Sequence, residues 1–231
     1  MNDKALEDFD YWWQVPGEWI EPPNARRGGT SGVVRHVPEQ GPTLYIKRQE
    51  GHIFRSFRYP FGRPTSLREA GALEHFRAIG LLVPTTRFFG IKRKDKWHAV
   101  LVTETLPQGF VSLDNLYPQT KIAPFSPTIQ NMLIEKLATT LARLHMKRWQ
   151  HSSLMPKHIF VRYSEATADG QAARVEVAFL DLERARKQFS SARAARRDLR
   201  FMRSLLTFWS EQDWMLFDQC YRRVFGRKVQ Y

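Results

Sequence analysis

The alternation of apolar and polar positions changes near residue 110. Before that point, β-branched and aromatic residues occur in short runs separated by Gly and Pro, a pattern typical of antiparallel strands. The runs are SGVVRHV (31–37), TLYIKRQ (43–49), TTRFFGIKR (85–93) and WHAVLVTET (97–105). One segment between them has the spacing of an amphipathic helix, with an apolar stripe made of Ala70, Leu73, Phe76 and Ile79. We expect this helix to have Ser66 as its N-cap and to stop at Gly80.

After Pro118 the periodicity becomes helical. Ser126 followed by Pro127 is typical of a cap with proline at the first helical position, and the apolar stripe that follows contains Ile129, Leu133, Leu137, Leu141 and Leu144. Two strands, HIFVRY (158–163) and ARVEVAFLD (173–181), are joined by a polar hairpin loop with an Asp169-Gly170 turn. The remainder, from Ala195, is mostly helical. The pattern predicts an α+β fold of two lobes, an antiparallel-sheet lobe with one helix and a mostly helical lobe.

Length and composition fit this layout. A chain of 231 residues suits one domain of two lobes, and we divide it into an N-terminal extension (1–25), an N-lobe (26–110) and a C-lobe (111–231). The single cysteine, Cys220, excludes an internal disulfide. The first twenty residues lack the apolar core of a secretory signal, and no apolar run reaches membrane-spanning length. We expect a cytoplasmic protein, either soluble or peripheral on a membrane.

The net charge of the chain predicts an anionic partner. The 36 Lys and Arg residues exceed the 23 Asp and Glu residues, giving a net charge of +13. Nucleic acid, an anionic membrane surface and a phosphorylated substrate all meet this requirement. No zinc-ligand spacing, RNP-like motif or basic zipper is present, so nucleic acid is not the expected partner. The segment IFRSFRYPFGRP (53–64) interleaves Arg55, Arg58 and Arg63 with aromatic residues, a pattern suited to a headgroup region or a phosphate-rich acceptor. The alternative is a basic loop that packs its aromatic rings on the N-lobe.

Candidate phosphate-handling residues occur in the N-lobe. GGTSGVV (28–34) lies between the first strands, where Gly29 and Gly32 would let backbone N–H groups approach phosphates. Taken alone, a plain turn that contains Gly28, Gly29 and Gly32 is the simpler interpretation of these glycines. Lys47 follows three strand-forming residues, as does the nucleotide-binding lysine of kinases, although a surface lysine on an edge strand is the simpler interpretation. Glu69, in the first turn of the following helix, would orient Lys47, or it would complete a capping box with Ser66.

Two further segments have the order of kinase motifs. WQHSSLMPKHIFV (149–161) has the rhythm of a catalytic loop, a His followed two positions later by Asp and five after that by Asn, but Ser153 and His158 stand at those two positions. VAFLDLERA (177–185) ends an apolar strand with Asp181, the position from which a kinase carboxylate holds magnesium. A strand-terminal Asp is common in other proteins as well.

Taken in order, these motifs resemble the lipopolysaccharide kinase family, the WaaP/InaA-type branch of the protein-kinase-like fold. The resemblance runs from about Arg27 to Trp209, and its most specific pieces are GRPTSLREAGALEHFRAIGLLVPTTRFFG, LVTETL, QHSSLMPKHIFV and FLDLERAR. It implies a bilobal fold, ATP and Mg²⁺ as cofactors, and phosphoryl transfer to a sugar of the lipopolysaccharide inner core at the cytoplasmic face of the inner membrane.

The resemblance also implies roles for individual residues. Lys47 would hold the phosphates and Glu69 would position it. Thr103, Glu104 and Leu106 would belong to the hinge that faces adenine. Asp181 would bind magnesium. Asp198 would brace the catalytic loop from below, unless it is only an acidic residue at a helix N-terminus.

The loop departs from the family pattern at the residue that matters most for chemistry. Ser153 replaces the Asp that accepts the proton of the acceptor hydroxyl, and no Asp or Glu occurs between His145 and Ser164. His158 would bind metal, contact phosphate or simply pack, and His151 would serve as a substitute base or support the loop backbone. Three functions remain open: a slow lipopolysaccharide kinase, a nucleotide-binding pseudokinase scaffold, and a kinase with another acceptor.

Overall fold

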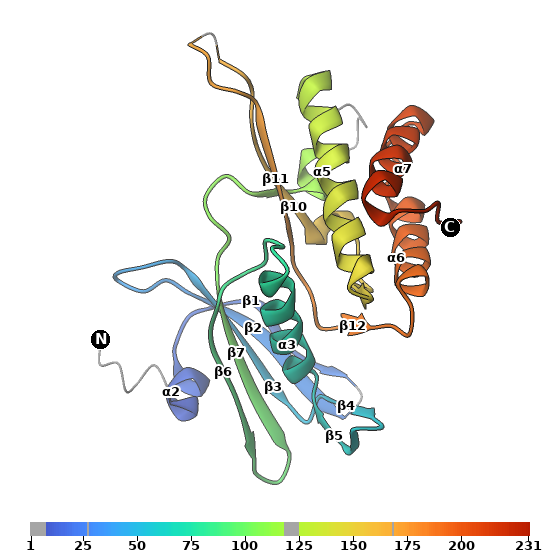
Figure 1. Ribbon diagram of the computed structural model, residues 1–231. Helices are drawn as coiled ribbons and strands as arrows, with labels where there is room; N and C mark the ends of the chain where they lie inside the picture. Colours follow the sequence, from blue (N-terminus) through green and yellow to red (C-terminus); the bar gives the residue numbers. More distant parts are fainter. Residues whose placement is uncertain (1–7, 27, 118–124, 168) are drawn as a thin grey trace. The chain divides into compact units, whose positions relative to one another are not determined.

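The computed structural model describes residues 8–26, 28–117, 125–167 and 169–231 (Figure 1). The chain divides into two compact units, which we call the N-terminal unit (residues 1–74 and 84–106) and the C-terminal unit (residues 75–83 and 107–231). Residues 75–83 fall inside the N-lobe of the sequence-based division, but they belong with the C-terminal unit. There, the backbone N–H of Phe179 donates to Leu82 O at 3.0 Å.

The N-terminal unit is built on a five-stranded antiparallel sheet with the strand order β1-β2-β3-β7-β6. The strands are β1 (Glu18–Arg26), β2 (Gly29–His36), β3 (Leu44–Glu50), β6 (Thr86–Arg93) and β7 (Trp97–Glu104). Four of them, β2, β3, β6 and β7, are the strands predicted from the apolar runs. The fifth, β1, comes from the segment that we had assigned to an N-terminal extension. Residues 1–7 of that extension lie outside the described residues.

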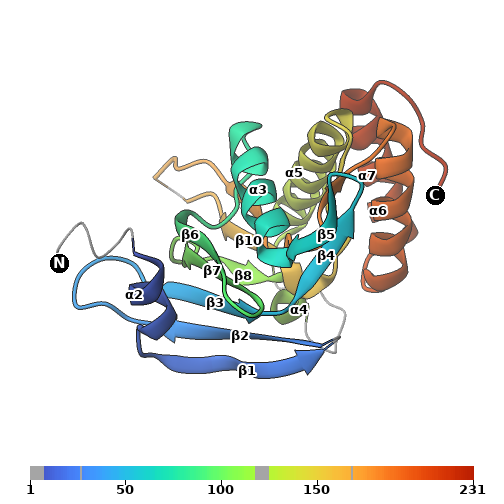
Figure 2. The same ribbon diagram turned by 90° about the horizontal axis from the view of Figure 1, so that it is seen from below.

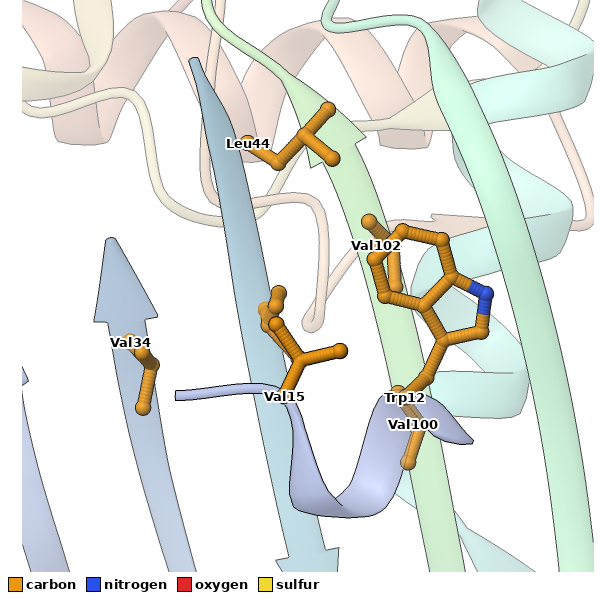
Figure 3. Close-up of a cluster of buried hydrophobic side chains, with 7 residues drawn as sticks. Trp12, Val15, Val34, Leu44, Val100 and Val102 are labelled. Atoms are coloured by element: carbon orange, nitrogen blue, oxygen red, sulfur yellow. The ribbon is translucent and has the colours of Figure 1, made fainter. Parts of the chain in front are cut away.

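One face of the sheet carries the core of the N-terminal unit. Helix α2 (Phe9–Gln14) places Trp12 on this face, and Val15 follows at its C-cap. The apolar side chains that pack with them are Val34, Leu44, Ile46, Val100 and Val102 (Figure 3). Arg48, from the same face, fixes the end of the helix because its guanidinium donates to the carbonyl oxygens of Trp12 and Val15. Helix α2 is therefore an integral part of the unit.

Helix α3 (Figure 2) comprises Thr65–Ala78. It begins one residue before the predicted N-cap. Ser66 is not the cap, because it lies inside the first turn, where its backbone N–H and its hydroxyl both donate to Oε1 of Gln49. The hydroxyl of Thr65 donates to the same oxygen at 3.1 Å. The first turn is thus satisfied by a buried side chain from β3 and not by Ser66 acting as an N-cap.

The basic and aromatic segment after β3 forms a hairpin, which the sequence pattern did not predict. Strands β4 (Ile53–Ser56) and β5 (Tyr59–Pro64) pair in antiparallel fashion, with a register shift between Phe54 and Ser56. The bulge at Arg55 breaks the two-residue alternation that would have marked the first strand.

The C-terminal unit is mostly helical, as predicted. Its helices are α4 (Leu113–Leu116), α5 (Pro127–Met146), α6 (Ser191–Leu205) and α7 (Glu211–Phe225), with the 3-10 turn η1 (Pro156–His158). Ser126 caps α5 by accepting a hydrogen bond from the backbone N–H of Ile129 at 3.3 Å, so the predicted start is confirmed. Buried apolar residues of α5 and α7, among them Leu137, Leu141 and Phe217, form the core of the unit.

Short strands complete the C-terminal unit. Strands β10 (Ile159–Ser164) and β11 (Arg174–Phe179) are the predicted hairpin, and β8 (Val111–Ser112) pairs with β10. Strands β9 (Trp149–Gln150) and β12 (Arg186–Lys187) form a separate pair, which holds the two ends of the segment 151–185 together. Within the described residues, no helix is both long enough and apolar enough to cross a bilayer.

Candidate functional site

Lys47 and Glu69 form an ion pair inside the N-terminal unit. Lys47 lies on β3, on the face opposite to the core cluster, because it is paired with Leu101 and Val33 while its neighbour Ile46 belongs to the cluster. Its Nζ is 2.8 Å from Oε2 of Glu69 on α3. The side chains retain only 17% and 13% of their surface exposure. A surface lysine on an edge strand does not fit this geometry, since β3 is a central strand.

Two glycines of β2, Gly29 and Gly32, have packing reasons to be glycine. A Cβ on Gly32 would lie 2.7 Å from the ring of Trp19, and one on Gly29 would lie 2.4 Å from the backbone nitrogen of His52. Gly32 is paired with Arg48, so its missing side chain is directed to the core face and away from Lys47. Close packing alone explains both residues, and their contact with a nucleotide stays a prediction.

The predicted hinge lies at the end of β7, where the chain passes from the N-terminal to the C-terminal unit after Leu106. Backbone N–H groups of Glu104 and Thr105 are already used, donating to Thr85 O and Thr43 O at 2.8 Å each. Thr103 is part of β7 and pairs with Tyr45. Within the described part of the chain, no acceptor is found for the N–H of Leu106, and its role as a hinge donor stays a prediction.

Asp198 holds the backbone of the candidate catalytic loop in the C-terminal unit. Its Oδ2 accepts from the backbone N–H of His151 at 2.7 Å, and its Oδ1 accepts from that of Ser152 at 2.9 Å. Oδ2 also lies 3.2 Å from Nε2 of His145. The side chain is fully buried. Asp198 is not a residue of a helix N-terminus, because it lies in the middle of α6, whose N-cap is Ser190.

Ser153, His158 and Asp181 form one cluster. The hydroxyl of Ser153 donates to Oδ2 of Asp181 at 2.9 Å. Nδ1 of His158 is 2.9 Å from Ser153 O and 3.4 Å from Oδ2 of Asp181. Ser152 and Asp181 have φ angles of 68° and 58°, a left-handed conformation that is costly for residues other than glycine and that collects at functional sites. The structure thus brings together three residues that the motif order had singled out.

The bonds of this cluster determine what each group can offer to a ligand. A carbonyl oxygen only accepts, so the contact with Ser153 O requires a proton on Nδ1 of His158, and Nε2 carries the lone pair when the ring is neutral. Oδ1 of Asp181 makes no hydrogen bond to the residues described here. The cluster therefore presents one carboxylate oxygen and one imidazole nitrogen.

This donor set fits magnesium that is bound mainly by phosphate oxygens. Mg²⁺ in nucleotide sites commonly takes one or two carboxylates and completes its shell with phosphates and water. Asp181 supplies one carboxylate, whereas the imidazole of His158 is a poorer ligand for so hard a cation. Among the described residues, no group of three or more His, Cys, Asp or Glu side chains could hold a metal by itself. A binding role for Asp181 thus depends on the nucleotide.

His151 is not placed to act as a base. Its residue surface is fully buried, and its ring lies near those of Phe76 and Phe179, with centroid distances of 6.4 Å and 5.7 Å. Neither ring nitrogen has a hydrogen-bond partner among the described residues. Burial lowers the pKa of His151 to about 4. An imidazole this deeply buried, with its pKa lowered, packs as part of the core and is poorly suited to take a proton from an acceptor.

The burial of His151 predicts a loss of stability in mild acid. The folded protein keeps this imidazole neutral down to its pKa of about 4, whereas the unfolded chain protonates it near 6.5. Its contribution is complete above pH 6.5 and is lost as the pH falls from 6.5 towards 4. Between pH 7 and pH 5, the wild-type protein should lose about 2 kcal/mol of unfolding free energy through this group. Urea titrations at both pH values should show a loss smaller by that amount in His151→Leu, and equal losses in both proteins would contradict the assignment.

Three residues of these networks were missed by the sequence analysis. The side chain of Gln49 accepts hydrogen bonds from the first turn of α3. His145 contacts Asp198, and the hydroxyl of Tyr221 lies 2.8 Å from Nδ1 of His145. One signal was available, because His145 stands beside the apolar stripe of α5 and is fully buried. A polar residue at such a position needs a partner. Gln49 offered no local signal, since its partners lie 16 and 17 residues further along the chain.

Comparison with known proteins identifies the fold and then the family. The chain is similar to WaaP in a solved structure of WaaP in complex with acyl carrier protein, with a TM-score of 0.71 and 19% identity over 93% of this chain and 82% of that one. It therefore has a protein-kinase-like fold. The sequence matches the Lipopolysaccharide kinase (Kdo/WaaP) family over residues 10–221. It is also 35% identical to Protein InaA of Escherichia coli (strain K12) over 209 residues, which cover 90% of this chain and 92% of InaA. The chain belongs to the lipopolysaccharide kinase family.

Proposed function

We propose that this protein binds ATP and Mg²⁺ and transfers phosphate slowly to an inner-core sugar of lipopolysaccharide, at the cytoplasmic face of the inner membrane. The observation that carries the proposal is the ion pair between Lys47 and Glu69 at 2.8 Å. Largely buried ion pairs lose much solvation energy, so they are weak devices for stability alone. A lysine held by a helix glutamate is, however, the arrangement that kinases require for phosphate binding. The net charge of +13 supports a phosphate-rich acceptor.

Each residue has a distinct role in this proposal. Lys47 holds the nucleotide phosphates, and Glu69 fixes the position of its ammonium group. The N–H of Leu106 donates to the adenine, and Asp181 binds the magnesium ion. When bound, Mg²⁺ would neutralise charge on the phosphate oxygens. Asp198 keeps the loop of Ser153 in place through two backbone N–H groups.

The proposed reaction is slow because the loop lacks a base. Ser153 is almost fully buried and uses its hydroxyl proton to bond Asp181, so it neither accepts a proton nor aligns an acceptor hydroxyl. A positioned general base contributes about 10²–10⁴-fold to rate. Most of the remaining catalysis of phosphoryl transfer comes from positioning and charge stabilisation, for which Lys47 and Asp181 are present.

The bond between Ser153 and Asp181 also favours a second candidate function. A protein that used the site only to bind nucleotide would have no need for a base, and the hydroxyl would then serve to hold the Asp181 carboxylate. Such a protein would act as a pseudokinase scaffold. Both candidates require nucleotide binding, and only transfer of phosphate separates them.

The first test is the response of the melting temperature to Mg-ATP. Ligand at a hundredfold excess over its Kd stabilises the folded state by about 2.7 kcal/mol, which for a chain of this size raises the melting temperature by about 5–10 °C. We expect this increase for the wild-type protein and less than a third of it for Lys47→Ala. Differential scanning fluorimetry with and without Mg-ATP measures both.

Lys92→Ala is the matched control for this experiment. Lys92 also forms an ion pair in the N-terminal unit, with Asp10 at 2.7 Å, but on the exposed strand β6. The variant should retain the full response to Mg-ATP. A wild-type protein that does not respond, or a Lys47→Ala protein that responds in full, would contradict nucleotide binding at this site. Transfer of the labelled γ-phosphate to purified lipopolysaccharide core then separates the slow kinase from the scaffold.

A further inference from the structure

The β4–β5 hairpin has an anchored base. The ring of Phe54 lies under the guanidinium of Arg68, 4.6 Å from its Cζ atom, and makes an edge contact with the ring of Tyr59 at a centroid distance of 6.1 Å. The guanidinium of Arg63 lies 4.6 Å from the ring of Trp97 on β7. These contacts join the hairpin to α3 and to the sheet within the N-terminal unit. Arg63 resembles the two other arginines of the hairpin in the sequence pattern, but its contact with Trp97 makes it part of the anchor.

The tip of the hairpin, in contrast to its anchored base, is exposed to solvent. Phe57 and Arg58 are the two residues of the turn, and Arg55 and Phe61 flank it. Phe57 is fully exposed and Phe61 retains 89% of its surface exposure. No Asp or Glu occurs between Gly51 and Arg68 in the sequence. Nor does any described carboxylate pair with Arg55 or Arg58. We call Arg55, Phe57, Arg58 and Phe61 the hairpin tip.

We propose that the hairpin tip inserts into the surface of an anionic lipid bilayer. Aromatic rings are stable at the boundary between headgroups and acyl chains, and arginines beside them pair with lipid phosphates. The tip offers both chemistries at once, two unpacked rings and two guanidinium groups without counter-charges. An acidic protein surface would satisfy the arginines but would leave the protruding rings without an apolar partner. The choice of a bilayer rests on the proposed function, in which the acceptor is membrane-borne.

The position of the hairpin in the chain indicates what insertion into a bilayer would achieve. The hairpin connects β3, which carries Lys47, to α3, which carries Glu69. A tip held by a bilayer would therefore keep the strand and the helix of the ion pair near the membrane. This would increase the encounter rate with a lipid-linked acceptor, since both partners would then diffuse along one surface.

Vesicle flotation tests the proposal with the full-length protein. We expect the wild-type protein to float with vesicles of phosphatidylcholine and phosphatidylglycerol and to remain free when phosphatidylcholine is the only lipid. The Phe57→Ser/Phe61→Ser variant should partition at least ~10-fold less, because it loses the apolar contribution, and Arg55→Gln/Arg58→Gln should be weakened by a similar factor. Both changes affect exposed side chains, so the melting temperature should stay the same.

Insertion can be distinguished from surface attraction by a dye at the tip. A Phe57→Cys variant in a Cys220→Ser background carries one exposed thiol for an environment-sensitive label. The label should shift to shorter wavelength on anionic vesicles, because it enters an apolar layer. The same label on Phe189→Cys, which replaces another strongly exposed phenylalanine, in the C-terminal unit, should shift less.

The matched charge control is Arg196→Gln/Arg197→Gln, which removes two exposed arginines from α6. It should change partitioning by less than about twofold. The proposal is overturned if the wild-type protein does not bind anionic vesicles, if the serine variant binds as well as wild type, or if the α6 variant loses as much binding as the hairpin variants. The hairpin variants should retain the full melting response to Mg-ATP. Loss of that response in all proteins with intact vesicle binding would count against the proposed function alone.

Discussion

Replacing Asp198 by Ala should lower the free energy of unfolding by about 3–5 kcal/mol. The carboxylate is fully buried and accepts from two backbone N–H groups of the loop and from His145. Removing it leaves three buried donors without an acceptor, and each costs about 1–3 kcal/mol when unsatisfied. The expected loss lies in the lower part of the range that the three donors sum to, because water can enter the space and the loop can relax. Urea denaturation followed by circular dichroism measures the change.

Two further variants test whether the loss of stability is specific to the buried carboxylate of Asp198. Asp213→Ala removes another Asp that accepts a backbone N–H in the same unit, at the exposed capping box of α7, and should cost only about 1 kcal/mol. Asp198→Asn keeps the size but replaces one acceptor by a donor that faces the backbone N–H groups, and should fall between wild type and Asp198→Ala. A cost for Asp198→Ala no larger than that for Asp213→Ala would show that the loop does not depend on this carboxylate.

Elements defined by local signals were predicted closely. Helix α5 begins at Pro127 with Ser126 as its cap, as expected, because both the cap and the proline act within one turn. The central strands β3 and β7 were also predicted, since each is an unbroken run of strand-forming residues. In these segments, sequence neighbours decide the conformation, and the pattern alone is sufficient.

Elements whose stability comes from distant contacts were missed. Helix α2 has only six residues, too few to be stable alone, and it depends on Trp12 packing against the sheet and on Arg48 binding its last carbonyl groups. The β4–β5 hairpin has a bulge and a proline, Pro60, which obscure its alternation. The start of α3 depends on Gln49, far away along the chain. No local sequence pattern indicates partners that are distant along the chain.

The same distinction holds for the candidate site. Motif order singled out Lys47, Glu69 and Asp181 as candidates, because the order of kinase elements along the chain is informative even when each residue alone is not. It did not show that the Ser153 hydroxyl bonds Asp181, or that His151 is enclosed by aromatic rings. Those facts depend on side-chain directions, and they change the interpretation of both residues: Ser153 becomes a partner of the proposed metal ligand, and His151 a part of the core.

Restoring the missing acid by Ser153→Asp should raise phosphoryl transfer by up to ~10²–10⁴-fold, the contribution of a positioned base. The physical cost follows from the geometry, because the Ser153 hydroxyl lies 2.9 Å from Oδ2 of Asp181 and a carboxylate there would repel that of Asp181. We therefore expect the variant to melt at a lower temperature than wild type without magnesium and to recover with Mg-ATP, since a divalent cation offsets the repulsion. Transfer of labelled γ-phosphate to purified lipopolysaccharide core gives the rate.

The control is Ser153→Asn, which has the size of the Asp variant but neither its charge nor its basicity. It should not increase transfer, and its melting temperature should not depend on magnesium beyond the wild-type response. If Ser153→Asp binds Mg-ATP and still transfers no phosphate, the protein is a nucleotide-binding scaffold. If the wild-type protein transfers phosphate efficiently and Ser153→Asp reduces the rate, another group has taken over the chemistry. The buried His151 cannot be that group, so His158, whose ring contacts both Ser153 and Asp181, would be the residue to replace next, with His158→Gln expected to abolish the activity.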